Sequence, residues 1–211
     1  QWTVQESCRQ MREWQQLYPK AENLTVAVNL SSKEFRQPEL AEKVAATLRS
    51  TGLPGKCLKL EITESHIMDH TGPALKMINR LRALGVEFSL DDFGTGYSSL
   101  SYLHRLPFSY LKIDRSFVSQ MCESTENSEI VNTIIRLAQS LNMKVVAEGV
   151  ETPEQAHKLL IRNCNFAQGY LFSRPMSADA ARRHIREAVS GIPLGTGDTS
   201  VTQITTYSPV A

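Results

Sequence analysis

Short apolar segments alternate with helical stripes along most of this chain, and this alternation constrains the fold more than any other feature. Each short segment is rich in β-branched residues, and the apolar residues that follow it recur at spacings of three and four. The expected strands are 24–30, 58–62, 86–90, 110–114, 144–147 and 166–172. Because right-handed crossovers connect consecutive parallel strands, the repeated strand and helix predict an α/β fold with a parallel sheet.

Residues with special backbone preferences mark where several helices begin and end. Pro38 is expected to open a helix that ends at Gly52, a typical position for a glycine after a helix C-terminus. Thr152 is expected to cap another helix, with Pro153 at its first position and Gln155 placed to complete a capping box. Ser177 is expected to begin the last helix.

Composition limits the size and the partners of this domain. A chain of 211 residues with 41% hydrophobic content can bury one sizeable core, and we expect a single domain over residues 1–190. From Gly191 onward glycine, proline, serine and threonine dominate without periodicity, so residues 191–211 are expected to form a disordered tail or linker. A net charge of +1 gives no reason to expect a nucleic acid polymer as partner.

The length of the apolar runs and the spacing of the cysteines indicate the cellular setting. The longest apolar runs fall far short of the ~20 residues that span a bilayer, so no membrane contact is expected from this segment. Its 4 cysteines form no Cys-x-x-Cys pair, which favours reduced thiols and a cytoplasmic location. The chain begins with Gln1 and enters a helical pattern at once, so we expect it to be a piece of a longer parent, which could itself be membrane-anchored.

Polar side chains stand at the ends of nearly all the expected strands. They are Asn29, Glu61, Asp91, Asp92, Lys112, Asp114, Glu148 and Gln168. In parallel α/β folds the carboxyl ends of the strands share one edge, and a closed barrel brings all of them to one site. A (β/α)₈ barrel has eight strands, so the six expected here predict a TIM-type barrel that lacks its first two.

The chemistry of these side chains points to metal-assisted phosphoryl transfer. The adjacent carboxylates of Asp91 and Asp92 repel each other unless a cation holds them. Carboxylate and amide oxygens, without histidine or thiolate, select Mg²⁺ or Mn²⁺. Two ions ~3.5 to 4 Å apart can assist displacement at phosphorus. Lys112 then offers a fixed positive charge, and Glu148 could bind metal or take a proton.

Six motifs in order resemble those of the EAL-type cyclic di-GMP phosphodiesterases. The motifs are Val28-Asn29-Leu30-Ser31, Glu61-Ile62-Thr63-Glu64, Asp91 to Ser99, Leu111 to Asp114, Val146 to Glu151 and Gln168 to Phe172. The resemblance covers about residues 1–190. It implies a (β/α)₈ barrel with two Mg²⁺ or Mn²⁺ ions. It also implies hydrolysis of one phosphodiester bond of cyclic di-GMP, a bacterial second messenger, to linear pGpG.

The resemblance also implies roles for individual residues. Asn29, Glu61 and Asp91 correspond to ligands of the first metal ion. Asp91 would bridge to a second ion completed by Asp92 and Glu148, and Lys112 would hold the nucleophilic water. Glu64 corresponds to the anchor of the glycine loop after Asp92, a region linked to homodimer formation. The remaining matched positions correspond to groups that contact the substrate or support the metal ligands: Asp114, Glu151 and Gln168.

One departure from the family is large. The Glu-Ala-Leu tripeptide that names the family, whose glutamate is a metal ligand, does not occur in the printed chain. We therefore expect this segment alone to be inactive or poorly folded, and the parent to carry the activity. Regulatory domains are expected N-terminal to it in the parent.

Other interpretations remain open from the sequence. The chain could be a catalytically degenerate receptor for cyclic di-GMP or a protein-interaction domain, or an enolase-like barrel with a single Mg²⁺. Asp91 and Asp92 alone would fit a simple turn, and Lys112 an ordinary surface lysine. His66 and His70 lie four apart, but no third ligand accompanies them, so a zinc site is rejected.

Overall fold

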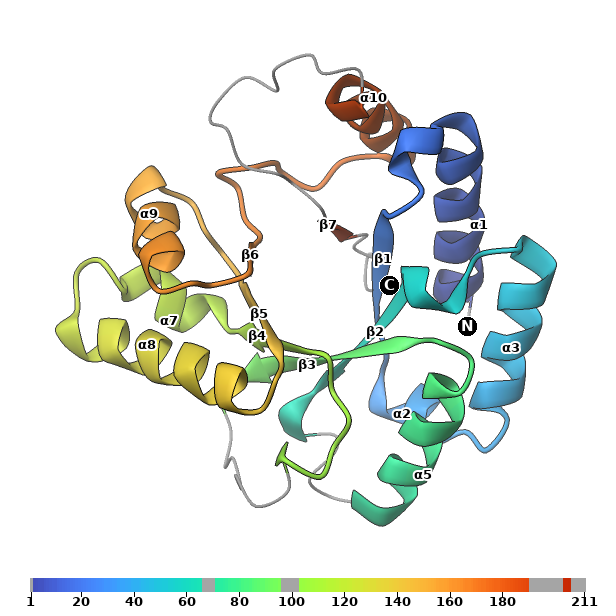
Figure 1. The fold of residues 1–211 in the computed structure, drawn as a ribbon, viewed down its shortest axis with the longest axis horizontal. Coiled ribbons are helices and arrows are strands. Elements are labelled where there is room, and N and C mark those ends of the chain that lie inside the picture. Colours follow the sequence, from blue (N-terminus) through green and yellow to red (C-terminus); the bar gives the residue numbers. More distant parts are fainter. Residues whose placement is uncertain (1, 66–70, 96–102, 190–202, 206–211) are drawn as a thin grey trace. The chain divides into compact units, whose positions relative to one another are not determined.

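The computed structural model describes residues 2–65, 71–95, 103–189 and 203–205, which group into two compact units (Figure 1). The first unit draws on residues 1–60, 79–87 and 175–211, and the second on residues 61–78 and 88–174. Strand β2 (Leu58–Thr63) and helix α5 (Thr71–Arg82) each run from one unit into the other. Among the described helices, none has both the length and the apolar character that crossing a membrane requires.

The first unit is organised around its N-terminal helix, α1, which packs against β1 and α3. Cys8, Met11 and Trp14 recur every three residues along α1 and are almost completely buried, so one face of the helix forms core. Gly52 ends α3 in the left-handed region at φ 70°, which confirms the expected helix end. The elements are α1 (Trp2–Leu17), η1 (Pro19–Ala21), β1 (Thr25–Asn29), α2 (Ser32–Phe35), α3 (Leu40–Thr51), η2 (Gly55–Cys57), α10 (Ala178–Val189) and β7 (Gln203–Thr205).

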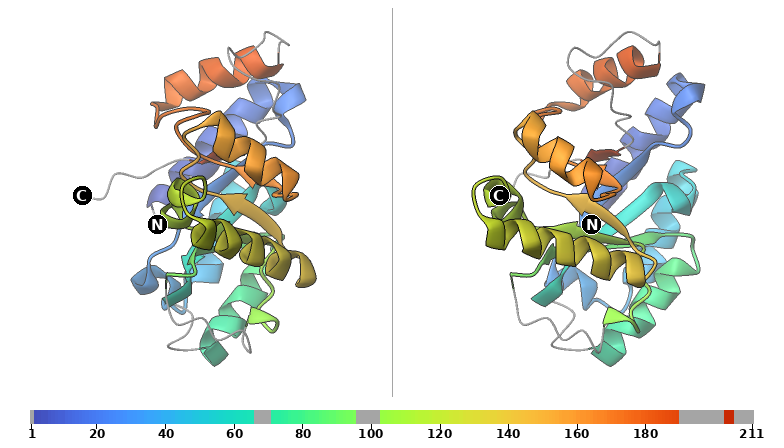
Figure 2. Two further views of the ribbon diagram at one scale, coloured as in Figure 1. Left: turned by 90° about the vertical axis from the view of Figure 1, so that its left-hand side faces the viewer. Right: turned by 60° about the vertical axis from the view of Figure 1, so that its left-hand side comes forward.

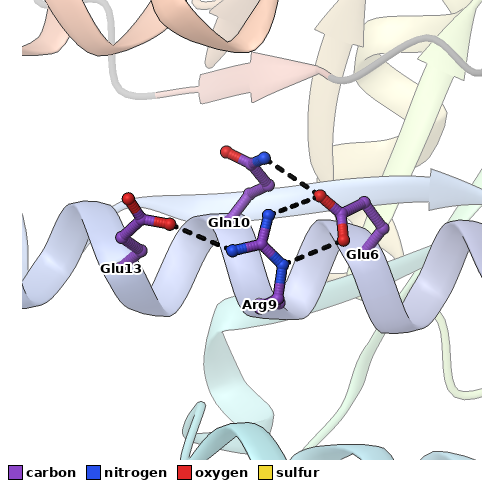
Figure 3. A network of polar contacts seen from close by, with 4 residues as sticks. All are labelled: Glu6, Arg9, Gln10 and Glu13. Atoms are coloured by element: carbon purple, nitrogen blue, oxygen red, sulfur yellow. Dashed lines mark hydrogen bonds and ion pairs between the residues drawn. The ribbon is translucent and has the colours of Figure 1, made fainter.

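The opposite side of α1 carries a network of charges in solvent. Figure 3 shows Arg9 between Glu6 and Glu13, with its guanidinium 2.6 Å from a Glu6 carboxylate oxygen and 3.1 Å from a Glu13 oxygen. Gln10 also donates to Glu6 at 3.0 Å. The hydrogen bonds from Arg9 and Gln10 lower the pKa of Glu6 to about 2. These are pairs at helical spacings of three and four, as expected for an ordinary solvated helix face.

The second unit is built on four strands, β3 to β6, which pair in parallel in chain order. Helix α8 packs against β4 and β5, and α7 packs against α8; Figure 2 shows both in two further views. Ile135 and Ala138 of α8 are buried, as are Leu111 of β4 and Val145 of β5. The elements are β3 (Glu87–Phe93), β4 (Tyr110–Ile113), α7 (Arg115–Gln120), α8 (Thr125–Ser140), β5 (Lys144–Ala147), α9 (Pro153–Ile161) and β6 (Phe166–Ala167).

The predicted alternation of strands and helices is confirmed, with differences at several boundaries. The last strand was predicted over residues 166–172, but β6 stops at Ala167 because the chain turns at Gly169, whose carbonyl accepts from the Phe172 N–H at 3.1 Å. Strand β3 continues through Asp91 and Asp92 to Phe93 rather than ending before them. The helix expected to open at Pro38 begins at Leu40.

Some expectations fall partly or wholly on residues outside the described ranges. His66 and His70 lie outside them, as do the last residues of the motif from Asp91 to Ser99 and most of the expected tail. Within that tail, β7 pairs in parallel with β1, Gln203 opposite Thr25. The division of the chain into a domain over residues 1–190 and a tail over residues 191–211 stays a prediction.

Gly169 is expected to tolerate no side chain. A Cβ at this position would lie 2.1 Å from the carbonyl oxygen of Val150 and 2.3 Å from its nitrogen, and backbone atoms have little freedom to yield. We therefore expect Gly169→Ala to lower the free energy of unfolding by about 3 kcal/mol. For a chain of this size that corresponds to a Tm about 6–12 °C lower, measured by thermal denaturation followed by circular dichroism.

Gly72 provides the matched control for this substitution. It lies in α5, and a Cβ there would meet nothing within 4 Å. Gly72→Ala should leave the Tm unchanged or raise it, because alanine favours the helix by up to about 1 kcal/mol. Equal Tm values for the two variants would refute the close approach of Gly169 to Val150.

Candidate functional site

The side chain of Lys112, on β4, is the centre of the polar cluster in the second unit. Its Nζ lies 2.7 Å from Glu61 Oε2, 3.0 Å from Asp91 Oδ1 and 2.6 Å from Glu148 Oε1. The Lys112 side chain is 4% exposed and that of Glu61 is 1% exposed, so this ion pair is fully withdrawn from water. Carboxylates from three separate segments thus converge on one ammonium group.

The charges of this cluster perturb one another strongly. Burial by itself lowers the pKa of Lys112, but the negative charges of Glu61, Glu148 and Asp91 outweigh it and hold that pKa above its ordinary range. Lys112 is therefore a fixed positive charge at neutral pH. Burial raises the pKa of Glu148 to about 7; the charge of Asp91 adds to this rise and that of Lys112 opposes it. Glu148 can therefore exchange a proton near neutral pH.

A break in the strand register brings the two aspartates to the same side. Strand β3 pairs with β4 at Leu90 opposite Leu111, and the pairing resumes at Phe93 opposite Ile113, so two residues of β3 stand against one of β4. Asp92 has φ 54°, which is uncommon for a residue with a side chain. In a regular strand neighbouring side chains point to opposite faces, but this bulge re-aims one of them.

The re-aimed aspartates form a possible metal site with Glu148. One carboxylate oxygen from each of Asp91, Asp92 and Glu148 can be chosen so that all three lie within 4.8 Å of one another. Burial raises the pKa of Asp92, and the charges of Asp91 and Asp114 raise it further, while Lys112 opposes them. An all-oxygen set of carboxylates that already repel one another suits a hard divalent cation.

Glu64 contacts the start of the glycine loop that follows β3. Its Oε2 accepts from the Gly94 N–H at 3.3 Å, while its Oε1 is buried and has no hydrogen-bond partner among the residues that the structure describes. Gly94 has φ 96°, and a Cβ there would lie 3.0 Å from the ring of Phe117. This contact is compatible with the expected anchoring role of Glu64, although the part of the loop from Gly96 lies outside the described residues.

The other predicted site residues are placed less centrally. The Asp114 carboxylate caps α7 by accepting from the Ser116 N–H at 2.9 Å. Glu151 is exposed and Gln168 is half-buried, both at the carboxyl ends of strands of the second unit. Asn29 is the exposed last residue of β1 in the first unit, so its expected metal contact stays a prediction.

Two features of the site were not anticipated from the sequence. One is the direct pairing of Lys112 with Glu61, Asp91 and Glu148, since opposite charges at strand ends do not by themselves specify a contact. The other is the side chain of Gln155, which was expected only to cap α9 but also reaches the loop after β5. The Thr152 to Gln155 spacing was the signal that located it.

Known proteins resemble this chain over most of its length. A family model described as the EAL domain matches residues 1–175. The cyclic di-GMP phosphodiesterase NbdA of Pseudomonas aeruginosa is 43% identical over 185 residues, which are 88% of this chain and 23% of NbdA. The chain thus spans about a quarter of the length of curated relatives that it matches.

Solved structures share the fold. The PaMucR phosphodiesterase in complex with c-di-GMP has a TM-score of 0.81 at 43% identity, covering 85% of this chain and 72% of that one. Klebsiella pneumoniae BlrP1, in a complex with manganese and cyclic di-GMP, has a TM-score of 0.71 at 30% identity, covering 81% of this chain and 44% of that one. The predicted α/β fold class is confirmed.

Proposed function

Because this chain belongs to the EAL domain family, we propose that it forms the larger part of a metal-dependent phosphodiesterase that hydrolyses cyclic di-GMP to linear pGpG. The observation that carries the proposal is the convergence of Glu61, Asp91 and Glu148 on the Lys112 ammonium group, with a carboxylate oxygen of Asp92 within 4.8 Å of those of Asp91 and Glu148. Relatives named as phosphodiesterases and structures solved with cyclic di-GMP support the choice of substrate.

The donor set fits two hard cations. We propose that Glu61, Asp91, Asp92 and Glu148, together with Asn29, hold two Mg²⁺ or Mn²⁺ ions, with Asp91 shared between them. The manganese complex of BlrP1 supports the choice of metal. When bound, such a pair of ions stabilises negative charge on the phosphodiester oxygens and makes hydroxide available at neutral pH.

The protein's own groups supply the remaining chemistry. Hydrolysis adds the hydroxyl of one water to phosphorus and leaves a proton for the departing sugar oxygen, so a group must hold and move that proton. Glu148, whose carboxylate lies 2.6 Å from Lys112 Nζ, can take it from the attacking water. Lys112, fixed by three carboxylates, orients the water and stabilises the negative charge that develops at phosphorus.

Further expectations about the whole protein belong to this proposal. We propose that the segment encoded before Gln1 contributes the missing Glu-Ala-Leu glutamate and two strands, that regulatory domains precede it, and that the enzyme acts in the cytoplasm. A homodimer would form through the region after Asp92. Asp114, Glu151 and Gln168 would contact the substrate or support the metal ligands.

A product assay tests the proposed function. The chain over residues 1–211, and a form extended by the ~70 residues encoded before Gln1 that two further barrel units require, are incubated with cyclic di-GMP and Mn²⁺. Chromatography with mass detection should find pGpG from the extended form and little or none from the chain alone. Chelation of the metal should stop the reaction. Binding of cyclic di-GMP by the extended form without pGpG would instead establish a receptor.

The raised pKa of Glu148 predicts how metal affinity depends on pH. A carboxylate must lose its proton to bind a metal ion, and the pKa of Glu148 in the folded protein is about 7. Mn²⁺ affinity should therefore rise by about tenfold between pH 6 and pH 8, with proton release on binding below pH 7. Titration calorimetry in buffers of different ionisation enthalpy measures both quantities.

The sign of the accompanying stability change follows from the same shift. The folded-state pKa of Glu148 lies above its ordinary value of 4.5, so between these two values the folded protein binds more protons than the unfolded one. The contribution of Glu148 therefore favours the metal-free fold at low pH and is lost as the pH rises toward 7. Glu148→Gln should remove this dependence of stability on pH. If the Mn²⁺ affinity of the unsubstituted protein is the same at pH 6 and pH 8, the raised pKa of Glu148 is contradicted.

A further inference from the structure

The loop after β5, residues 148–152, carries Glu148 and Glu151 outside any helix or strand. Its first half is held by the neighbouring strand segments. The Glu148 N–H donates to the Ile113 carbonyl at 3.1 Å, and the Val150 N–H donates to the Gln168 carbonyl at 3.0 Å. The position of the Glu148 carboxylate therefore depends on how the second half of the loop is held.

Gln155 holds that second half. Its Oε1 accepts from the Glu151 N–H at 2.8 Å and from the Thr152 N–H at 3.0 Å. Its Nε2 donates to the Ser119 carbonyl at the end of α7, at 3.4 Å. The residue is 6% exposed, so these bonds form away from bulk water, where an unmade bond is costly.

Capping of α9 does not account for all of these contacts. A capping box needs only two bonds: the Thr152 N–H donates to the Gln155 side chain, and the Gln155 N–H donates to the Thr152 hydroxyl at 3.2 Å. The bonds to Glu151 and Ser119 reach one residue further into the loop and across to a second helix. The same amide thus ties the loop of Glu148 to α7 and α9 together.

The loop has little room to adopt another path. Gly149, next to Glu148, has φ 70°, and a Cβ there would lie 2.6 Å from Cβ of Arg115. Val150 is completely buried. A displacement of Glu151 would therefore be transmitted along a tight segment to the carboxylate of Glu148, which lies 2.6 Å from Lys112 Nζ.

We propose that Gln155 is a positioning residue of the site: through the Glu151 and Thr152 N–H groups it fixes the loop that presents Glu148 to Asp91 and Lys112. The inference rests on the proposed function, because it takes Glu148 to be a metal ligand. Groups that orient metal ligands typically contribute 10- to 100-fold to metal affinity or activity, about the effect expected here.

The test compares variants in the N-terminally extended protein. Gln155→Met keeps the length of the side chain but removes its acceptor and donor. It should weaken Mn²⁺ binding by about tenfold and lower kcat by a similar factor, with KM for cyclic di-GMP nearly unchanged. Gln155→Glu keeps the two acceptor bonds to the loop and should restore Mn²⁺ affinity to within about threefold of the parent.

Thr152→Ala is the matched control. It removes the side-chain cap of the same helix but leaves the Gln155 amide in place. It should lower the Tm as Gln155→Met does while leaving Mn²⁺ affinity within about twofold. Equal Mn²⁺ affinities for Gln155→Met and Thr152→Ala would overturn the proposal and leave Gln155 as a helix cap alone.

Gln155→Asn is a second substitution for the case in which Gln155→Met does not fold. Its side chain is one methylene shorter, so the amide no longer reaches the loop although the site stays polar, and the same weakening of Mn²⁺ binding is expected. Metal affinity is measured without substrate, by calorimetry. If the unsubstituted extended protein binds Mn²⁺ but yields no pGpG, the proposed hydrolysis is refuted, while the Mn²⁺ affinities still decide the role of Gln155.

Discussion

Asp91→Asn is expected to reduce the rate of pGpG formation by the N-terminally extended protein by at least ~100-fold. Groups that only orient metal ligands already contribute 10- to 100-fold, and a shared ligand should lie at or beyond the upper end of that range. Asp91 lies 3.0 Å from Lys112 Nζ and belongs to the carboxylate cluster with Asp92 and Glu148. The amide has the same shape but lacks the negative charge that two cations would share.

The measurement is kcat at saturating Mn²⁺ and cyclic di-GMP, with stability recorded in parallel. Asp179→Asn makes the same chemical change at an exposed position in the first turn of α10 and should leave kcat unchanged. If circular dichroism shows that Asp91→Asn remains folded, its loss of kcat arises at the site. An Asp91→Asn variant with the rate of the parent would remove Asp91 from the mechanism and with it the shared metal ligand.

Lys112→Met is expected to lower the free energy of unfolding by about 3–5 kcal/mol in metal-free buffer, the range found when one partner of a buried ion pair is removed. Methionine fills a similar volume, so the loss is one of charge. Without Lys112, the carboxylates of Glu61, Asp91 and Glu148 stay together, with side chains 1%, 10% and 18% exposed, and no cation among them. Urea denaturation with chelator present measures the difference.

Two further responses distinguish lost charge from lost packing. The stability of Lys112→Met should recover as the pH falls, because protonation of the clustered carboxylates removes the repulsion among like charges that Lys112 no longer offsets, so the folded state takes up protons more readily than the unfolded state. Added Mn²⁺ should also recover stability, since it neutralises the same carboxylates. Lys158→Met, which removes a partly exposed lysine 3.0 Å from the exposed Glu154, should change little. If Lys112→Met is as stable as the unsubstituted protein, the Lys112 ammonium group does not hold the carboxylates together.

Much of the fold could be predicted from local patterns. The strands around Leu60, Leu111 and Val145 consist of residues whose side chains favour the interior, and their burial is set by composition over a few positions. The cap formed by Thr152 and Gln155 follows from two side chains three residues apart, and the helix end at Gly52 follows from the backbone freedom of glycine. By contrast, the turn at Gly169 that follows β6 brings its backbone close to that of Val150, a contact between separate segments.

The sequence by itself determined the chemistry of the site: carboxylates and a lysine at the carboxyl ends of parallel strands, which the rule of a shared sheet edge brings together. Only the tertiary structure decided how they meet. The bulge between Leu90 and Phe93 turns Asp91 and Asp92 to one side, whereas strand alternation predicts opposite sides. The physical reason is that strand identity depends on short-range preferences, but register, bulges and ion pairs such as Lys112 with Glu61 depend on the neighbouring strands, whose positions no local pattern contains.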